Sequence, residues 1–194
     1  MVGRVVLNAP LAAASARPPY HFYASVKAAM GEKVIKHVEW RSSPECPRPD
    51  VSFVPPMERR RLTGVERAAI SVAWRVYPKG EEVPVVFASR WGEIGTTIKL
   101  MKQCHDEGEM SPASFYAYVQ NAAPGVFSIL TKNHAPYTAI AAGARSREMG
   151  WLEATAMRGR VVFVYAEEDT PEFYRPEFGE PVTAYAEAFL LEID

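Results

Sequence analysis

The sequence predicts an α/β fold, in which a five-stranded mixed sheet has helices packed on its faces. Short apolar runs alternate with stretches of helical periodicity, the order that produces a layered sheet. Two strand-like segments follow each other near the carboxyl end, which indicates an antiparallel edge. The 194 residues are enough for one domain with a substantial core. We therefore expect a single domain over 1–194, with 9–50 as an insertion or loop region rich in proline and charge.

The first half of the chain contains two predicted strands around one well-marked helix. Val2–Leu7 is a short apolar run typical of a buried strand. Thr63 and Glu66 have the spacing of a capping box, and the helix that they begin carries two apolar stripes. Such a helix is buried between layers or covered by a partner. Val85–Ala88 is continuously apolar, as in a central strand covered on both faces.

The second half predicts more helices and three strands. The helix after Ser89–Gly95 places Ile94, Ile98, Met101 and Cys104 on one side, so Cys104 is expected to be a core thiol. Ser111-Pro112 opens a short helix, and another helix covers Asn121–Leu130. The remaining elements are a strand at Tyr137–Ala141, a helix at Ala144–Met157, and strands at Arg160–Tyr165 and Val182–Ile193.

Composition excludes several classes of function. The net charge is −1, with 22 Lys and Arg against 23 Asp and Glu, whereas general nucleic-acid and anionic-membrane binders need a basic surplus. Cys46 and Cys104 form neither a disulfide framework nor the spacing of a zinc site, which favours a reducing cytoplasm. There is no Walker motif or dinucleotide fingerprint, and no apolar run is long enough to span a bilayer. We expect no cofactor and no metal.

The junction at 137–144 is the segment that bears most directly on function. It combines a short strand, a tight turn and the start of a helix, and many α/β enzymes mount a nucleophile at such a junction. Here the apex holds Ala142 and Gly143, without Cys, Ser or Thr. The pattern therefore predicts a catalytic scaffold that lacks the reactive atom.

Four segments in register carry a family resemblance: Phe53–Thr63, Val85–Ile94, Met110–Gly125 and Pro136–Gly143. Together they resemble the amino-terminal beta-ketoacyl synthase-like family, of the chain-length-factor type found in aryl polyene clusters. The resemblance implies one half of a thiolase fold. In active members the turn carries the Cys that takes the acyl chain, and a second half supplies two His residues. In this chain the matching nucleophile position is vacant at Gly143, and His21, His37, His105 and His134 lie in no motif that could replace those histidines.

The resemblance implies a subunit without independent activity. It would pair with a full-length ketosynthase, shape the tunnel for the growing chain, and reach an acyl carrier protein through that partner. The strand before the turn would pair across the two-fold axis, which assigns Tyr137, Thr138, Ala139, Ile140 and Ala141 to the interface. Further interface or tunnel candidates are Phe115, Asn121, Val126, Phe127 and Ile129.

Two other functions remain open at the level of sequence. The chain could process acyl thioesters with a displaced nucleophile, for which Cys104, Ser128 and Ser146 are the candidates. Alternatively, it could be a homodimeric scaffold or binding module, in which the same strand edge pairs with its own copy.

Overall fold

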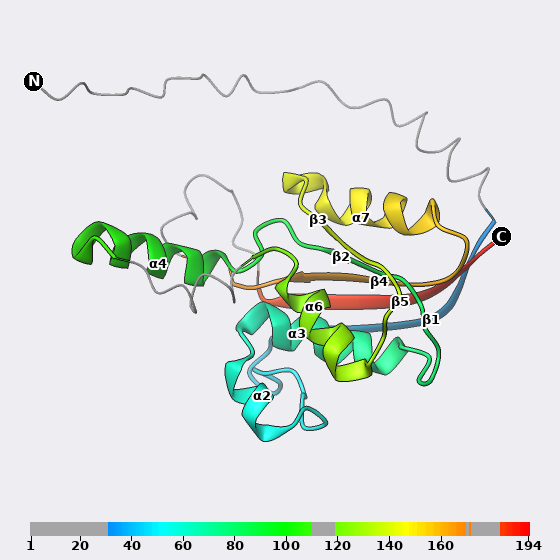
Figure 1. The fold of residues 1–194 in the computed structure, drawn as a ribbon, viewed down its shortest axis with the longest axis horizontal. Coiled ribbons are helices and arrows are strands. Elements are labelled where there is room, and N and C mark those ends of the chain that lie inside the picture. The colour runs from blue at the N-terminus through cyan, green and yellow to red at the C-terminus, as the bar shows by residue number, and fades with distance from the viewer. Residues whose placement is uncertain (1–30, 110–118, 170, 172–182) are drawn as a thin grey trace, which may run out of the picture. The chain divides into compact units, whose positions relative to one another are not determined.

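The fold is built on a single mixed sheet (Figure 1). The computed structural model describes residues 31–109, 119–169, 171 and 183–194. Within them the strands are β1 (Glu32–Arg41), β2 (Val85–Ala88), β3 (Tyr137–Ile140), β4 (Gly159–Glu167) and β5 (Tyr185–Ile193). Their order across the sheet is β1-β5-β4-β2-β3. The structure confirms the predicted α/β class and the five-stranded mixed sheet.

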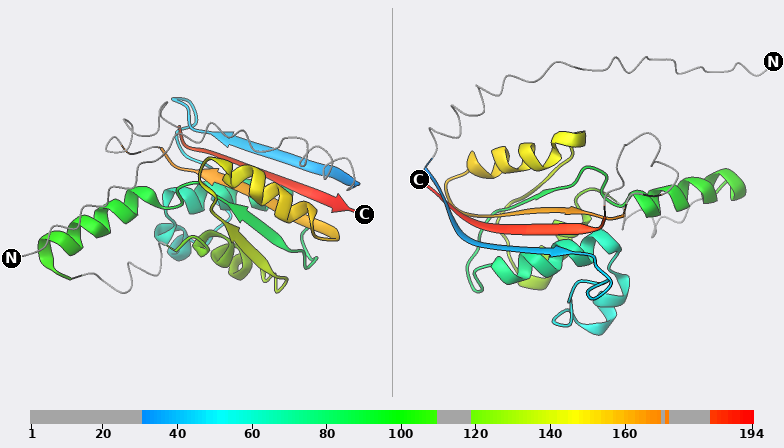
Figure 2. Two further views of the ribbon diagram at one scale, coloured as in Figure 1. Left: turned by 90° about the horizontal axis from the view of Figure 1, so that it is seen from above. Right: turned by 180° about the vertical axis from the view of Figure 1, so that it is seen from behind.

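The strand directions divide the sheet into two parts. β2 runs parallel to both β3 and β4, whereas β5 runs antiparallel to both β4 and β1. The predicted antiparallel pair at the carboxyl end is therefore present as β4 and β5. β3 and β1 form the two edges, and the carboxyl ends of β2, β3 and β4 lie together at one end of the sheet (Figure 2).

β1 corrects part of the prediction for residues 9–50. A ten-residue strand occupies Glu32–Arg41, inside the range expected to be insertion or loop. Charged and exposed side chains dominate this edge strand, and a register shift between Val34 and Lys36 breaks its alternation. Val38 and Trp40 pack against the core on one face, and the His37 ring stacks on Phe189 on the other. The predicted strand Val2–Leu7 lies outside the described residues.

One face of the sheet is covered by α3 (Gly64–Val76) and α6 (Ala122–Thr131). The predicted capping box at the start of α3 is present: the Glu66 amide donates to Thr63 Oγ1 at 3.2 Å, and the Thr63 amide donates to Glu66 Oε2 at 2.8 Å. The apolar stripes of α3 are buried, with Ile70 and Val72 fully enclosed, as expected of a helix between layers. The short helix α2 (Pro56–Arg61) precedes α3.

The opposite face is covered by α7 (Ser146–Thr155), which follows the single 3-10 turn η1 (Gly143–Arg145). Trp151 of α7 meets Phe163 and Phe189 edge-on, at centroid distances of 5.5 and 5.0 Å. Gly150 lies directly on the sheet, because a Cβ built there would be 2.6 Å from Ala88 Cβ. Helices on both faces give three layers, with the junction at 137–144 at the end of the sheet.

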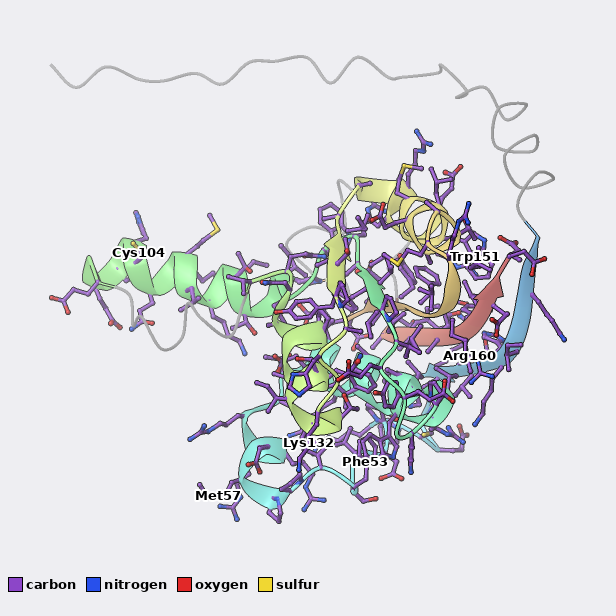
Figure 3. All side chains as sticks on the ribbon, turned by 45° about the vertical axis from the view of Figure 1, so that its right-hand side comes forward. Phe53, Met57, Cys104, Lys132, Trp151 and Arg160 are labelled. Atoms are coloured by element: carbon purple, nitrogen blue, oxygen red, sulfur yellow. The ribbon has the colours of Figure 1, made fainter. Side chains whose placement is uncertain are left out.

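α4 (Ile94–Glu107) extends beyond the end of the sheet (Figures 1 and 2). Leu100 is its only buried residue, and Met101 is 64% exposed. Cys104 is exposed near the far end of the helix, so the prediction of a core thiol was wrong (Figure 3). The segment is helical, as predicted from its apolar stripe, but that stripe does not pack on the sheet.

Candidate functional site

The turn after β3 is open and is built for glycine. Gly143 has a φ of +59°, in the left-handed region that favours glycine, and no atom lies within 4 Å of a Cβ built at this position. A side chain here would project into free space at the carboxyl end of β3. The predicted strand-to-helix turn is therefore present, with a glycine at the position that the resemblance assigns to the nucleophile.

Ser146 holds this turn in place. Its hydroxyl accepts a hydrogen bond from the Ala142 amide at 2.9 Å and donates one to the Gly143 carbonyl at 2.8 Å. The residue is fully buried. Its hydroxyl thus satisfies two backbone groups of a tight turn, and it faces the protein rather than a substrate.

The other two candidate nucleophiles are also far from a catalytic arrangement. The Ser128 hydroxyl donates to the Gly125 carbonyl of its own helix at 3.0 Å. Cys104 lies exposed on α4, where its neighbour His105 is exposed as well. Cys104, Ser128 and Ser146 therefore lie apart from one another, on α4, α6 and α7.

Three charged residues at the start of α7 and in the turn before it have partners within the chain. Arg147 donates through its Nε and one terminal nitrogen to the two carboxylate oxygens of Glu187 on β5, and this bond raises the pKa of the guanidinium. Glu187 is only 3% exposed, and His37 of β1 lies 3.7 Å from it. Arg145 pairs with Glu148 at 3.1 Å. This network was not predicted from the sequence; the signal for it is a glutamate inside an otherwise apolar strand, which needs a partner when buried.

A second buried carboxylate organises the loop beside the turn. Glu167, at the end of β4, accepts hydrogen bonds from the Arg90 and Trp91 amides and from the Ser89 hydroxyl. Burial raises the pKa of its carboxyl group. The loop after β2 is therefore tied to β4, and Gln120 ties it to the segment before α6 by donating to the Ser89 carbonyl at 3.2 Å.

β3 is an edge strand with polar backbone groups directed outward. The carbonyls of Pro136 and Ile140 accept hydrogen bonds from β2. Because these groups alternate along a strand, the N–H and C=O groups of Tyr137 and Ala139 point to the free side. Among the described residues, no strand pairs with this side.

The predicted interface and tunnel residues do not form one group. Tyr137 is 41% exposed, Thr138, Ala139 and Ile140 are half-buried, and Ala141 is exposed. Ile129 of α6 is 73% exposed, and Tyr137 Oη would lie 3.5 Å from a Cβ built at Gly125 of the same helix. β3 and α6 therefore present a common surface.

The other candidates lie elsewhere. Phe127 points into the core, where it meets Tyr77 edge-on at 5.4 Å. Val126 is half-buried, Asn121 is exposed at the start of α6, and Phe115 lies outside the described residues. Within the described ranges, no group of three or more His, Cys, Asp or Glu side chains could hold a metal ion. In the same ranges, no helix has the length and apolar character needed to cross a membrane.

A mixed sheet between helical layers, with a tight turn after β3 and a helix packed on the sheet behind it, matches a thiolase-like ketosynthase fold. The model of the beta-ketoacyl synthase N-terminal domain matches residues 36–193, and the chain belongs to this family. The family resemblance carried by the four sequence segments is therefore confirmed. A comparison with curated protein sequences found no match.

Three solved structures illustrate the likeness. A chain in the complex of a ketosynthase (ApeO) with its chain length factor (ApeC) from Xenorhabdus doucetiae has a TM-score of 0.73 and 22% identity, covering 83% of this chain and 78% of that one. A beta-ketoacyl synthase from Burkholderia phymatum STM815 has a TM-score of 0.57 and 13% identity, covering 89% of this chain. The ishigamide ketosynthase/chain length factor has a TM-score of 0.51 and 13% identity, covering 90%. The chain spans 54% of the length of each of the last two. At these identities the likeness concerns the fold.

Proposed function

We propose that this chain is a non-catalytic chain-length-factor subunit. It pairs in the cytoplasm with a complete ketosynthase, in aryl polyene or fatty-acid-like polyketide biosynthesis, and meets an acyl carrier protein through that partner. The observation that carries the proposal is Gly143, which occupies the apex of a preserved strand–turn–helix junction in a left-handed conformation. A glycine cannot form the thioester that a condensation reaction requires.

The edge at β3 supports the pairing. Its outward N–H and C=O groups can extend the sheet into a second subunit, which satisfies backbone groups that water otherwise has to satisfy. The exposed side chains of Tyr137 and Ile129 lie on the same surface and supply apolar contact area. The similar structure from Xenorhabdus doucetiae is a ketosynthase in complex with its chain length factor, which is the assembly proposed for this chain.

The test is co-expression with a complete ketosynthase encoded beside this chain, followed by size-exclusion chromatography. We expect the two chains to co-elute at the mass of a heterodimer. Replacing Ala139 by proline removes one outward N–H without removing a hydrogen bond to β2, so this variant should elute alone. Circular dichroism of A139P checks that the variant is folded. Separate elution of the unmodified chain and the ketosynthase would contradict the proposal.

Two further measurements decide between this function and the alternatives. Light scattering on the purified chain reports a homodimer, which would favour the scaffold reading if no ketosynthase binds. Incubation with acyl-carrier thioesters, followed by intact-mass measurement, reports acylation. A stable acyl adduct on this chain would overturn the non-catalytic assignment.

A further inference from the structure

We propose that the junction between α3, α4 and the end of β4 is a proton-binding site that controls the orientation of α4. The site is formed by three carboxyl groups from three elements: Glu66 of α3, Glu93 at the start of α4, and Glu168 directly after β4. This assignment is separate from the proposed pairing at β3, because it concerns the isolated chain.

A single hydroxyl links the helix starts. The Glu66 amide donates to Thr63 Oγ1, and this hydroxyl donates in turn to Glu93 Oε1. The backbone of Glu93 continues the link into α4, because its carbonyl accepts hydrogen bonds from the Thr97 amide and hydroxyl, at 2.8 and 2.9 Å. The start of α4 is therefore attached to the start of α3 through the side chain of Glu93.

Glu168 provides the second attachment of α4. Its Oε1 accepts a hydrogen bond from the Gly95 amide in the first turn of the helix. The carboxylate is so close that a Cβ built at Gly95 would lie 3.2 Å from Oε1, and a Cβ at Gly64 of α3 would lie 3.8 Å from Oε2. Glu168 thus lies between the amino-terminal ends of both helices.

Glu93 is the group that is least suited to carry a charge. It is only 6% exposed, and its Oε2 is buried without a hydrogen-bond partner. Loss of water, together with the nearby carboxyl groups of Glu168 and Glu66, raises the pKa of Glu93 to about 8, although the hydrogen bond from Thr63 acts in the opposite direction. Desolvation also raises the pKa of Glu66 and of Glu168.

The charges around the site come from each element that meets there. Arg67 of α3 acts on Glu66, and Lys99 of α4 acts on Glu168; both favour the ionised forms. Glu167 and Asp169, on either side of Glu168, oppose its ionisation. Arg90 lies in the loop before α4, and its backbone amide donates to the Glu167 carboxylate. The carboxyl groups outnumber these cations, so a bound proton relieves repulsion inside the junction.

The direction of α4 depends on these two attachments, because little of the helix is buried. Leu100 is the only buried residue of this helix, so few apolar contacts fix its direction. Ionisation of Glu93 places a negative charge in a buried junction beside two other carboxyl groups, and the resulting repulsion and loss of hydration oppose the closed arrangement that makes both attachments. The protonated junction holds α4 in the orientation described, and deprotonation releases it.

The chain carries natural probes for this motion. It has two cysteines, and both are exposed: Cys104 lies on α4 and Cys46 lies in the loop after β1. Spin labels on both thiols report the distance from α4 to the loop after β1 by double electron–electron resonance, with unlabelled chain added to suppress intermolecular signals. At about pH 6 we expect one narrow distance distribution, and at about pH 9 the loss of this distribution to a broad one.

The variant Glu93→Gln keeps the acceptor for Thr63 but cannot ionise, so its distribution should stay narrow at about pH 9. The matched control is Glu107→Gln, an exposed glutamate at the other end of α4, which should broaden like the unmodified chain. An unchanged distribution between the two pH values, or equal broadening in E93Q, would overturn the proposal. Neither result depends on whether a ketosynthase binds.

Discussion

Replacing Gly150 by alanine tests how closely α7 lies on the sheet. The new methyl group would lie 2.6 Å from Ala88 Cβ and 2.7 Å from Phe163 Cε2. Carbon atoms in contact are separated by about 3.5–4.0 Å, so α7 would have to move outward by about 1 Å. Ala88 Cβ cannot rotate away, because it is attached directly to the backbone of β2.

Over-packing of this kind costs about 1–3 kcal/mol, and the two simultaneous clashes place Gly150→Ala near the upper limit. Alanine is the better helix former by about 1 kcal/mol, which offsets part of the loss. We expect a net destabilisation of about 2 kcal/mol. For a chain of this size, that is a fall of about 4–8 °C in Tm.

Urea unfolding, followed by circular dichroism, measures this difference. The matched control is Gly64→Ala in α3, where the nearest atom to the added Cβ is Glu168 Oε2 at an ordinary 3.8 Å. G64A should be neutral or more stable by as much as about 1 kcal/mol. If G150A unfolds at the same urea concentration as the unmodified chain, the close packing between α7 and β2 would be refuted.

Three further changes test the site. Arg147→Ala leaves the buried carboxylate of Glu187 without the guanidinium that binds both of its oxygens, and should lower the free energy of unfolding in urea by about 2 kcal/mol. The double variant R147A/E187Q should recover part of that loss. Equal losses in the two variants would contradict the pairing. Gly143→Ala places a side chain at a φ of +59° and should cost about 1 kcal/mol, and Gly143→Asn should cost less; no difference in thermal melts would contradict the left-handed turn. The carboxyl pKa of Glu93 is raised from 4.5 to about 8, so the folded chain binds its proton more tightly than the unfolded chain. The stability that this gives is complete below about pH 4.5 and lost as the pH rises through about 8, and urea titrations across this range should show a smaller decline for E93Q.

The parts of the fold that were predictable from sequence are those with a strong local pattern. Val85–Ala88 is continuously apolar and is also a central strand buried on both faces. The helix at Thr63 combined a capping box with apolar periodicity, and both are present in α3. The junction after β3 was predictable as a strand, a turn and a helix in close succession, although α7 begins at Ser146, two residues later than predicted.

The missed features lacked such a pattern. β1 is an edge strand with a register shift, so its inward residues Val38 and Trp40 are too few to produce a period of two. In α4 the apolar stripe was visible, but periodicity does not say what covers it, and Cys104 was misplaced for that reason. Glu187 in an apolar strand indicates that a partner exists, but no local pattern identifies that partner as Arg147, 40 positions away.

β3 has a consequence for how a partner is chosen. Its backbone groups are identical for every incoming strand, and the strand is only four residues long. For either proposed pairing, selection therefore falls to the side chains beside the edge, above all Tyr137 and Ile129. A second copy and a ketosynthase would compete for the same edge, so the relative amounts in which the two proteins are made would help to set which pair predominates.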